Sequence, residues 1–181
     1  MKSTQVYRII RDVIGPWAKS VGFKRGTGGM LNYVRSADGL FHTFWFQCSQ
    51  DGWDTHTGSK VTLEFQESTR PEPGCGGTRI RFFRLLSPDD REQVRSIQNS
   101  VISKLSLPPG GHWSHDLQQD TKKWYFAKFE LVREPYRDTD DVWLRYGQDA
   151  DVRQWAEFIL EKLPRLLDEF NARCQTARHG A

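Results

Sequence analysis

The chain has 181 residues, of which 37% are hydrophobic and 13% aromatic, and its formal net charge is +3. This length suits one domain with one hydrophobic core. The aromatic content excludes a disordered chain, and the lack of any run of about 18 apolar residues excludes a membrane-spanning helix. A net charge this small does not by itself indicate nucleic-acid binding.

The N-terminal segment and the cysteines favour a cytoplasmic protein. Charges at Arg8, Arg11 and Asp12 interrupt the region that would be apolar in a secretion signal. The chain has 3 cysteines at wide spacings and no Cys-x-x-Cys pair. This pattern excludes a zinc ribbon and indicates a reducing compartment.

The first half of the chain predicts one helix and then several strands. Apolar residues at spacings of three and four from Val6 to Val21 predict a helix that is capped by Ser3 or Thr4 and ended by Gly22. Alternating patterns predict strands over residues 31–36, 40–49, 60–68 and 79–86. An Asp-Gly pair between the first two strands is typical of a tight hairpin turn.

The second half contains two further helix signals. Ser87 is a good N-cap, Pro88 suits the first helical position, and Asp89 and Asp90 suit the first turn, so a helix is predicted from Pro88. The last helix is expected to begin near Asp149 or Asp151. Two strands are predicted between these helices, over residues 124–132 and 142–146.

These elements predict the fold class. Strict alternation of strands and helices is missing, so we expect an α+β protein rather than a parallel sheet. The expected architecture is a mostly antiparallel sheet of about five or six strands with three helices packed mainly on one face. We expect one domain over residues 1–174 and a disordered C-terminal tail over residues 175–181.

The strongest candidate for a functional site is a recognition surface on the strand 40–49 and the loop that follows it. Trp45 faces away from Phe44 and Phe46 in the strand alternation. Tryptophans that reach the surface favour interfaces and binding pockets. The candidate binding residues are Trp45, Gln47, Ser49, Asp51, Trp53, Asp54 and His56. The alternative is that both sheet faces are covered and that the tryptophans only pack.

An enzyme that uses the loop 51–56 is the first alternative function. A carboxylate from Asp51 or Asp54 could orient His56 as a general base. The same residue types are also common hydrogen-bonding residues of turns. No residue is assigned a catalytic role on this basis.

Nucleic-acid binding is a weaker alternative. Arg79, Arg81 and Arg84 lie among Ile80 and two phenylalanines, and basic and aromatic side chains on a sheet can clamp a single strand. Charges that protect a sheet edge from pairing would give the same pattern. We therefore expect that nucleic acid is not the partner.

Metal and cofactor sites have little support in the sequence. His112 and His115 have a spacing that could suit one ion, but no third ligand is fixed by spacing. The glycine-rich segments 26–29 and 74–77 lack the Gly-Lys-Ser/Thr continuation of a phosphate-binding loop. We expect no metal and no cofactor.

The order of motifs resembles a known family. The segments VIGPWAKSVGFKR, FWFQCSQDGW and VTLEF, an Arg-rich strand, and the closing segment DVRQWAEFILEKLPRLLDEF are similar to the uncharacterised family numbered 4304 among domains of unknown function. The resemblance covers most of residues 5–170 and supplies no catalytic residues. It implies a small cytoplasmic bacterial protein. By analogy, it implies an immunity-like or regulatory module that binds another protein. We expect a monomer or a homodimer, the latter if a sheet face or edge is uncovered.

Overall fold

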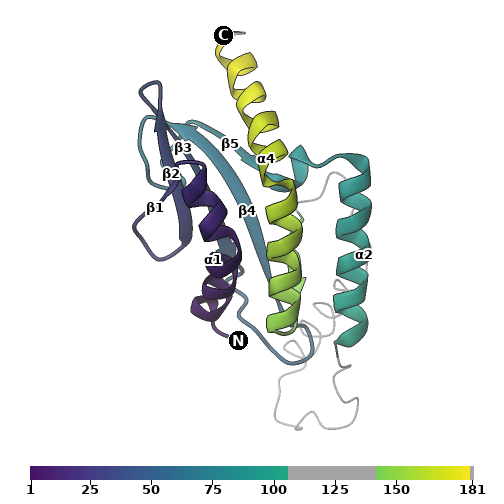
Figure 1. Cartoon of the computed structure of the whole chain (residues 1–181). Coiled ribbons are helices and arrows are strands. Elements are labelled where there is room, and N and C mark those ends of the chain that lie inside the picture. The colour runs from purple at the N-terminus through teal and green to yellow at the C-terminus, as the bar shows by residue number, and fades with distance from the viewer. Residues whose placement is uncertain (106–141, 180–181) are drawn as a thin grey trace, which may run out of the picture.

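The computed structural model describes residues 1–105 and 142–179. Within these residues the chain forms three α-helices, one short 3-10 helix and a six-stranded antiparallel sheet, so the predicted α+β fold is confirmed (Figure 1). The helices are α1 (Ser3–Ser20), α2 (Pro88–Lys104) and α4 (Asp149–His179), and the 3-10 helix is η1 (Phe82–Leu85). The strands are β1 (Lys24–Arg25), β2 (Leu31–Ala37), β3 (Leu40–Cys48), β4 (Ser59–Ser68), β5 (Thr78–Arg81) and β6 (Leu144–Tyr146).

The sheet follows the chain order from β1 to β5, and β6 also pairs with β4. One edge of β4 pairs with β3 along its length, while the other edge pairs with β5 near its end and with β6 near its start. The turn between β2 and β3 has positive φ at both Asp38 (53°) and Gly39 (75°). Two successive residues with positive φ match the twist of the flanking strands, as the Asp-Gly signal predicts.

The core lies between the sheet and the helices. In the register of the central strands, Phe44 pairs with Phe65, and Phe46 pairs with Leu63. All four side chains are buried in the same cluster as residues of α1 and α4. Figure 1 shows α1 and α4 side by side in front of the sheet, with α2 beyond α4. We call the sheet face that is turned away from α1 and α4 the outer face.

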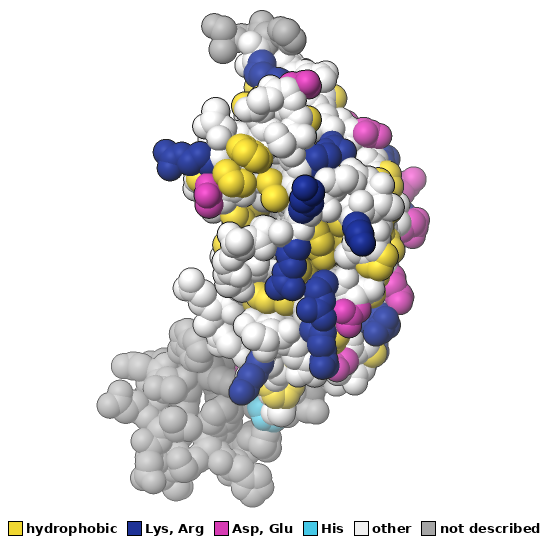
Figure 2. Space-filling view, turned by 60° about the vertical axis from the view of Figure 1, so that its left-hand side comes forward, with side chains coloured by type: hydrophobic (Ala, Val, Ile, Leu, Met, Phe, Trp, Pro, Cys, Tyr) yellow, Lys and Arg dark blue, Asp and Glu magenta, His cyan; other side chains and the backbone are white. Residues whose placement is uncertain are grey.

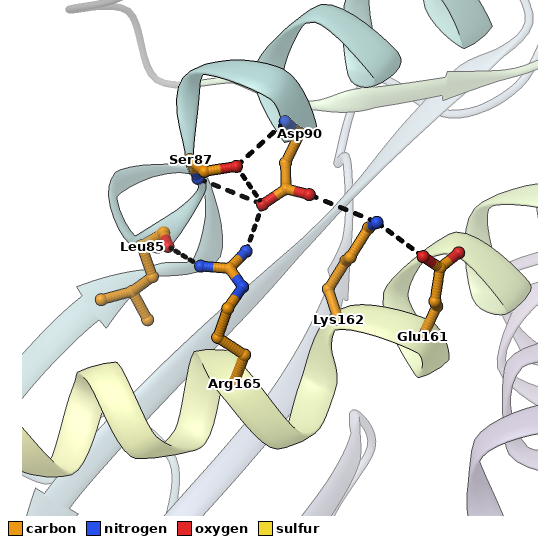
Figure 3. Close-up of polar contacts among 6 residues, drawn as sticks. All are labelled: Leu85, Ser87, Asp90, Glu161, Lys162 and Arg165. Carbon is orange, nitrogen blue, oxygen red and sulfur yellow. Dashed lines mark hydrogen bonds and ion pairs between the residues drawn. The ribbon is translucent and has the colours of Figure 1, made fainter.

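A buried carboxylate joins α2 to α4. The Ser87 side chain accepts a hydrogen bond from the Asp90 backbone, and Asp90 accepts bonds from the Ser87 backbone and hydroxyl, which completes a capping box. Asp90 also pairs with Lys162 at 3.3 Å and with Arg165, both on α4 (Figure 3). The predicted helix start is confirmed. Its residue Asp90 also fixes the position of α4 relative to α2.

The structure corrects the predicted strand over residues 79–86. The strand ends at Arg81, and Phe82–Leu85 form a 3-10 helix. Phe82 and Phe83 are both buried, with their ring centroids 6.4 Å apart. Successive residues of a strand point to opposite faces, so a strand would expose one of these rings. The short helix lets both rings reach the core.

Two helix ends and one short strand also differ from the prediction. The first helix begins at Ser3 with Lys2 as its N-cap and no side-chain cap. The two-residue strand β1 was not predicted, because its sequence, Lys-Arg, carries no apolar signal. The last helix continues to His179 instead of ending before 175. Cys174 continues the buried stripe four residues after Phe170, and Arg178 in the next turn pairs with Glu67 of β4 at 3.4 Å, which holds the extension against the sheet.

None of the helices in the described ranges is both long and apolar enough to cross a membrane. The predicted strand over 124–132 and the pair His112 and His115 lie outside the described residues.

Candidate functional site

The predicted recognition loop joins the end of β3 to the start of β4. The backbone N–H of Ser49 donates to the Lys60 carbonyl at 2.8 Å, and an isolated bridge pairs Asp54 with Gly58. Trp53 anchors the middle of the loop, because its indole N–H donates to the Gly147 carbonyl at 3.1 Å. The loop is therefore attached to the fold at Trp53 as well as at its two ends.

Asp54 holds the tight turn within this loop. One carboxylate oxygen accepts the backbone N–H groups of His56 and Thr57 at 2.8 and 2.7 Å, and the other accepts the Thr57 hydroxyl. Sequence analysis left two roles for Asp54, orienting His56 as a base or hydrogen bonding within a turn. These contacts are those of the turn role. Gly58 has a φ of +59°, and a Cβ there would lie 2.2 Å from the Tyr146 carbonyl oxygen. The loop thus needs glycine where it passes β6.

A small pocket of about 60 Å³ opens beside the loop. Its lining includes Ser49 and Asp51 from the loop, Lys60 from β4 and Arg145 from β6. The Ser49 hydroxyl donates to Asp51 at 3.0 Å, and Lys60 pairs with the same carboxylate oxygen at 3.2 Å. The side chains of Asp51 and Lys60 are 46% and 34% exposed. The pocket is thus built from charges of both signs that solvent can reach.

Arg145 supplies the more buried positive charge of this pocket. Burial lowers the pKa of its guanidinium to about 10, although the carboxylates of Asp54 and Asp51 act in the opposite direction. Arg145 therefore remains charged at neutral pH. Its guanidinium also donates to the Thr57 carbonyl, so Arg145 ties the loop to β6. Sequence reasoning missed Lys60 and Arg145. The pairing of β3 with β4 places Lys60 beside Ser49, and the pairing of β6 with β4 brings Arg145 to the same place.

The other predicted residues of this site lie on the outer face of the sheet. Trp45 is only 2% exposed. Its cross-strand neighbour Glu64 is also 2% exposed and pairs with Arg79 and with Arg81, the latter at 3.0 Å. The Arg79 guanidinium lies over the Trp45 ring, 5.3 Å from its centroid. Trp45 is thus a packed residue in this structure. Gln47, two residues further along β3, is half-buried.

The predicted recognition surface around Trp45 and the arginines of the nucleic-acid alternative therefore meet on the outer face of the sheet. Arg81 also lies over the ring of Trp143, at 5.4 Å, and Lys60 lies over the same ring at 5.9 Å. Glu64 compensates part of the charge of Arg79 and Arg81. Arg84 does not belong to this group, because it follows the strand and lies exposed on η1. The three arginines of the nucleic-acid alternative thus do not form one row.

Metal-ligating side chains do not gather elsewhere in the described ranges. Across residues 1–105 and 142–179, no group of three His, Cys, Asp or Glu side chains has a geometry that could hold an ion.

A second and larger pocket lies at the opposite end of β4. It has a volume of about 410 Å³, and its lining includes Glu67, Cys75 and Arg178. Arg178 pairs with Glu67 at 3.4 Å, and Glu67 also contacts His42 at 3.2 Å. Burial lowers the pKa of His42 although Glu67 acts to raise it. These contacts join β3, β4 and the end of α4, which is a structural role.

Comparisons with known proteins give one partial likeness. A stretch of 89 residues, or 48% of the chain, is 28% identical to a tail fiber protein of Enterococcus phage phiEF24C. The match spans 5% of that protein's length. No family model matches the chain, and no solved structure matches it. The resemblance to the family numbered 4304 stays a prediction.

Proposed function

We propose that this protein is a non-enzymatic module that binds another protein through the loop 49–58 and the pocket beside it. The observation that carries the proposal is the fixed shape of this loop. Asp54 fixes the turn within the loop and Trp53 ties the loop to Gly147, while Asp51 and Lys60 remain partly exposed. A loop that is ordered before binding loses little conformational entropy when a partner docks, which favours recognition.

The size of the pocket supports a protein partner over a small molecule. Sites for small ligands usually have volumes of about 300–1,000 Å³. The pocket beside Asp51 measures about 60 Å³, which suits the end of one side chain. Charges of both signs around it favour a polar or charged side chain of the partner. The name of the tail fiber protein that part of the chain resembles states no enzymatic reaction.

The enzyme alternative gains less from the geometry. It requires a carboxylate that orients an imidazole as a base. Asp54 uses both of its oxygens for the backbone and hydroxyl groups of its own turn. Asp51 lines the pocket, whereas Asp54 and His56 do not. The residues that this alternative needs are therefore not presented together to one cavity.

The proposal can be tested by capture from a lysate of the source organism with tagged, folded variants. Asp51→Arg and Thr55→Arg place bulk and charge on exposed positions of the loop, and Gln93→Arg does the same on α2. We expect the loop variants to lose one stoichiometric protein partner that wild type and Gln93→Arg retain. Matching thermal unfolding curves show that the variants are folded. Equal capture by all four proteins contradicts the proposal.

A further inference from the structure

A second surface carries an excess of positive charge that the proposed binding loop does not use. Residues 1–37 contain seven Lys or Arg and one acidic residue, Asp12. The fold brings five of these cations to one side of the molecule, on α1, β1 and β2. We call them the basic surface: Arg8, Arg11, Lys19, Arg25 and Arg35. Figure 2 shows Lys and Arg side chains along the middle of this side, with acidic side chains along its right-hand rim and a few beside the lower basic side chains.

Positions across the seam between α1 and the sheet show that two of these cations, Arg11 and Arg25, are neighbours. Arg8, Arg11 and Lys19 share one face of α1, because they lie three and eight residues apart along the helix. Gly15 lies on the same face, and a Cβ there would be 3.3 Å from the Tyr33 hydroxyl and 3.7 Å from Arg11. Arg25 pairs with Tyr33 in the sheet. Arg11 and Arg25 therefore flank the same tyrosine.

Arg35 extends the basic surface to the turn between α1 and β1. Its guanidinium donates to the Val21 carbonyl at 3.2 Å and lies over the Phe23 ring, 4.7 Å from the centroid. Val21 itself is 36% exposed. No other large hydrophobic side chain in the described part of the chain is as exposed. The basic surface thus has an apolar side chain at the turn where α1 meets β1.

Most of this charge is not compensated by the fold. Arg11 pairs with Asp12 at 3.1 Å, but both side chains are about half exposed, so the pair is weak. Among the residues that the structure describes, Arg8, Lys19 and Arg25 have no ion pair with an acidic side chain, and all three are exposed. Clustered cations attract an acidic partner and raise its rate of association.

The chemistry of the basic surface favours an acidic protein segment over single-stranded nucleic acid. Single-stranded nucleic acid is usually held by aromatic rings on which bases stack. The two aromatic rings here, Phe23 and Tyr33, are 2% and 4% exposed and cannot serve as such a platform. Val21 instead offers the kind of apolar contact that protein interfaces surround with polar groups. We propose that the basic surface binds an acidic segment of a partner protein.

A labelled 20-residue poly-L-glutamate peptide and a 20-base-pair DNA duplex are suitable probes for fluorescence anisotropy. The full chain is compared with two double variants that change the net charge equally. Arg8→Glu with Arg25→Glu reverses the basic surface, and Arg84→Glu with Arg153→Glu reverses two exposed arginines elsewhere. The distant charges are screened at 150 mM salt, where the Debye length is about 8 Å. Circular dichroism checks that all three proteins are folded.

We expect the peptide to bind wild type at 50 mM salt and to lose at least about tenfold in affinity by 300 mM. At 150 mM salt the first double variant should bind it about tenfold or more weakly, and the second should stay within about twofold. No binding of the peptide at 50 mM salt, or equal losses in both double variants, overturns the proposal. Tighter binding of the duplex than of the peptide through Arg8 and Arg25 also overturns it, in favour of nucleic acid.

Discussion

Replacing Asp90 by Asn tests whether one carboxylate joins α2 to α4. Asp90 is 5% exposed and accepts hydrogen bonds from Ser87, while Lys162 and Arg165 pair with it from α4. An amide oxygen at position 90 accepts weaker hydrogen bonds from Ser87 than a carboxylate does, which costs about 1 kcal/mol. Loss of the charge adds about 1–2 kcal/mol, a value kept low because Arg165 is 48% exposed. We expect Asp90→Asn to lower the free energy of unfolding by about 2–3 kcal/mol at pH 7.

The pH dependence of this effect follows from the pKa of Asp90. Burial acts to raise this pKa, but hydrogen bonds from Ser87 and the contacts with Lys162 and Arg165 outweigh burial and lower it. A carboxyl whose pKa is lower in the folded state stabilises the fold above its unfolded pKa of about 3.9. That stabilisation is lost as the pH falls through the folded pKa. The difference between wild type and Asp90→Asn should therefore narrow below about pH 4.

Urea unfolding followed by tryptophan fluorescence at pH 7, 5 and 3 measures this effect. Asp89→Asn is the matched control, because Asp89 lies exposed in the same helical turn. Its loss should cost at most about 0.5–1 kcal/mol through the helix dipole. The reasoning is refuted if Asp90→Asn and Asp89→Asn destabilise the protein equally at pH 7. A difference from wild type that stays constant down to pH 3 would also refute it.

Three further outcomes are expected. Glu64→Gln should cost about 1–2 kcal/mol in urea unfolding, because Glu64 is buried and pairs with Arg79 and Arg81; a cost no larger than that of the exposed Glu92→Gln would contradict this. Gly58→Ala should cost more than about 2 kcal/mol in the same assay, since its Cβ would meet the backbone of β6. Gly52→Ala, which has open space, should cost about 1 kcal/mol, and equal costs would argue against a close approach at Gly58. Cys174 is 1% exposed and burial raises the pKa of its thiol to about 11, so a disulfide reagent at pH 8 should modify Cys75 first and Cys174 only on unfolding. Equal rates for the two thiols in the folded protein would count against this placement.

Local signals in the sequence were sufficient for most elements of the fold. The Ser-Pro-Asp-Asp segment predicts a helix from Pro88, and the structure confirms that start. The Asp-Gly pair predicts a tight hairpin, and both of its residues have positive φ. These features depend on neighbouring residues alone. The 3-10 helix over Phe82–Leu85 was missed because burial of two adjacent rings, a tertiary effect, decided the local backbone.

The candidate site was less accessible to sequence reasoning. Alternation in β3 correctly places Trp45 opposite Phe44 and Phe46, but it does not show what covers the outer face. Arg79 lies over the Trp45 ring, and Glu64 lies beside Trp45 and pairs with Arg79. This arrangement depends on the pairing of β5 with β4, a contact between distant segments. In the same way, Arg145 reaches the pocket only through the pairing of β6 with β4. Charges that meet across a sheet depend on register, which a single sequence does not determine.

The most direct test of the central claim is photo-cross-linking in cells of the source organism. A photoreactive phenylalanine derivative is placed at Thr55, at the exposed tip of the loop 49–58, and in a second protein at Gln93 on α2. If the loop binds a protein partner, the chain labelled at Thr55 should form one defined covalent adduct that the chain labelled at Gln93 does not form. No adduct at Thr55, or the same adducts from both positions, would contradict the claim that this loop is the binding site.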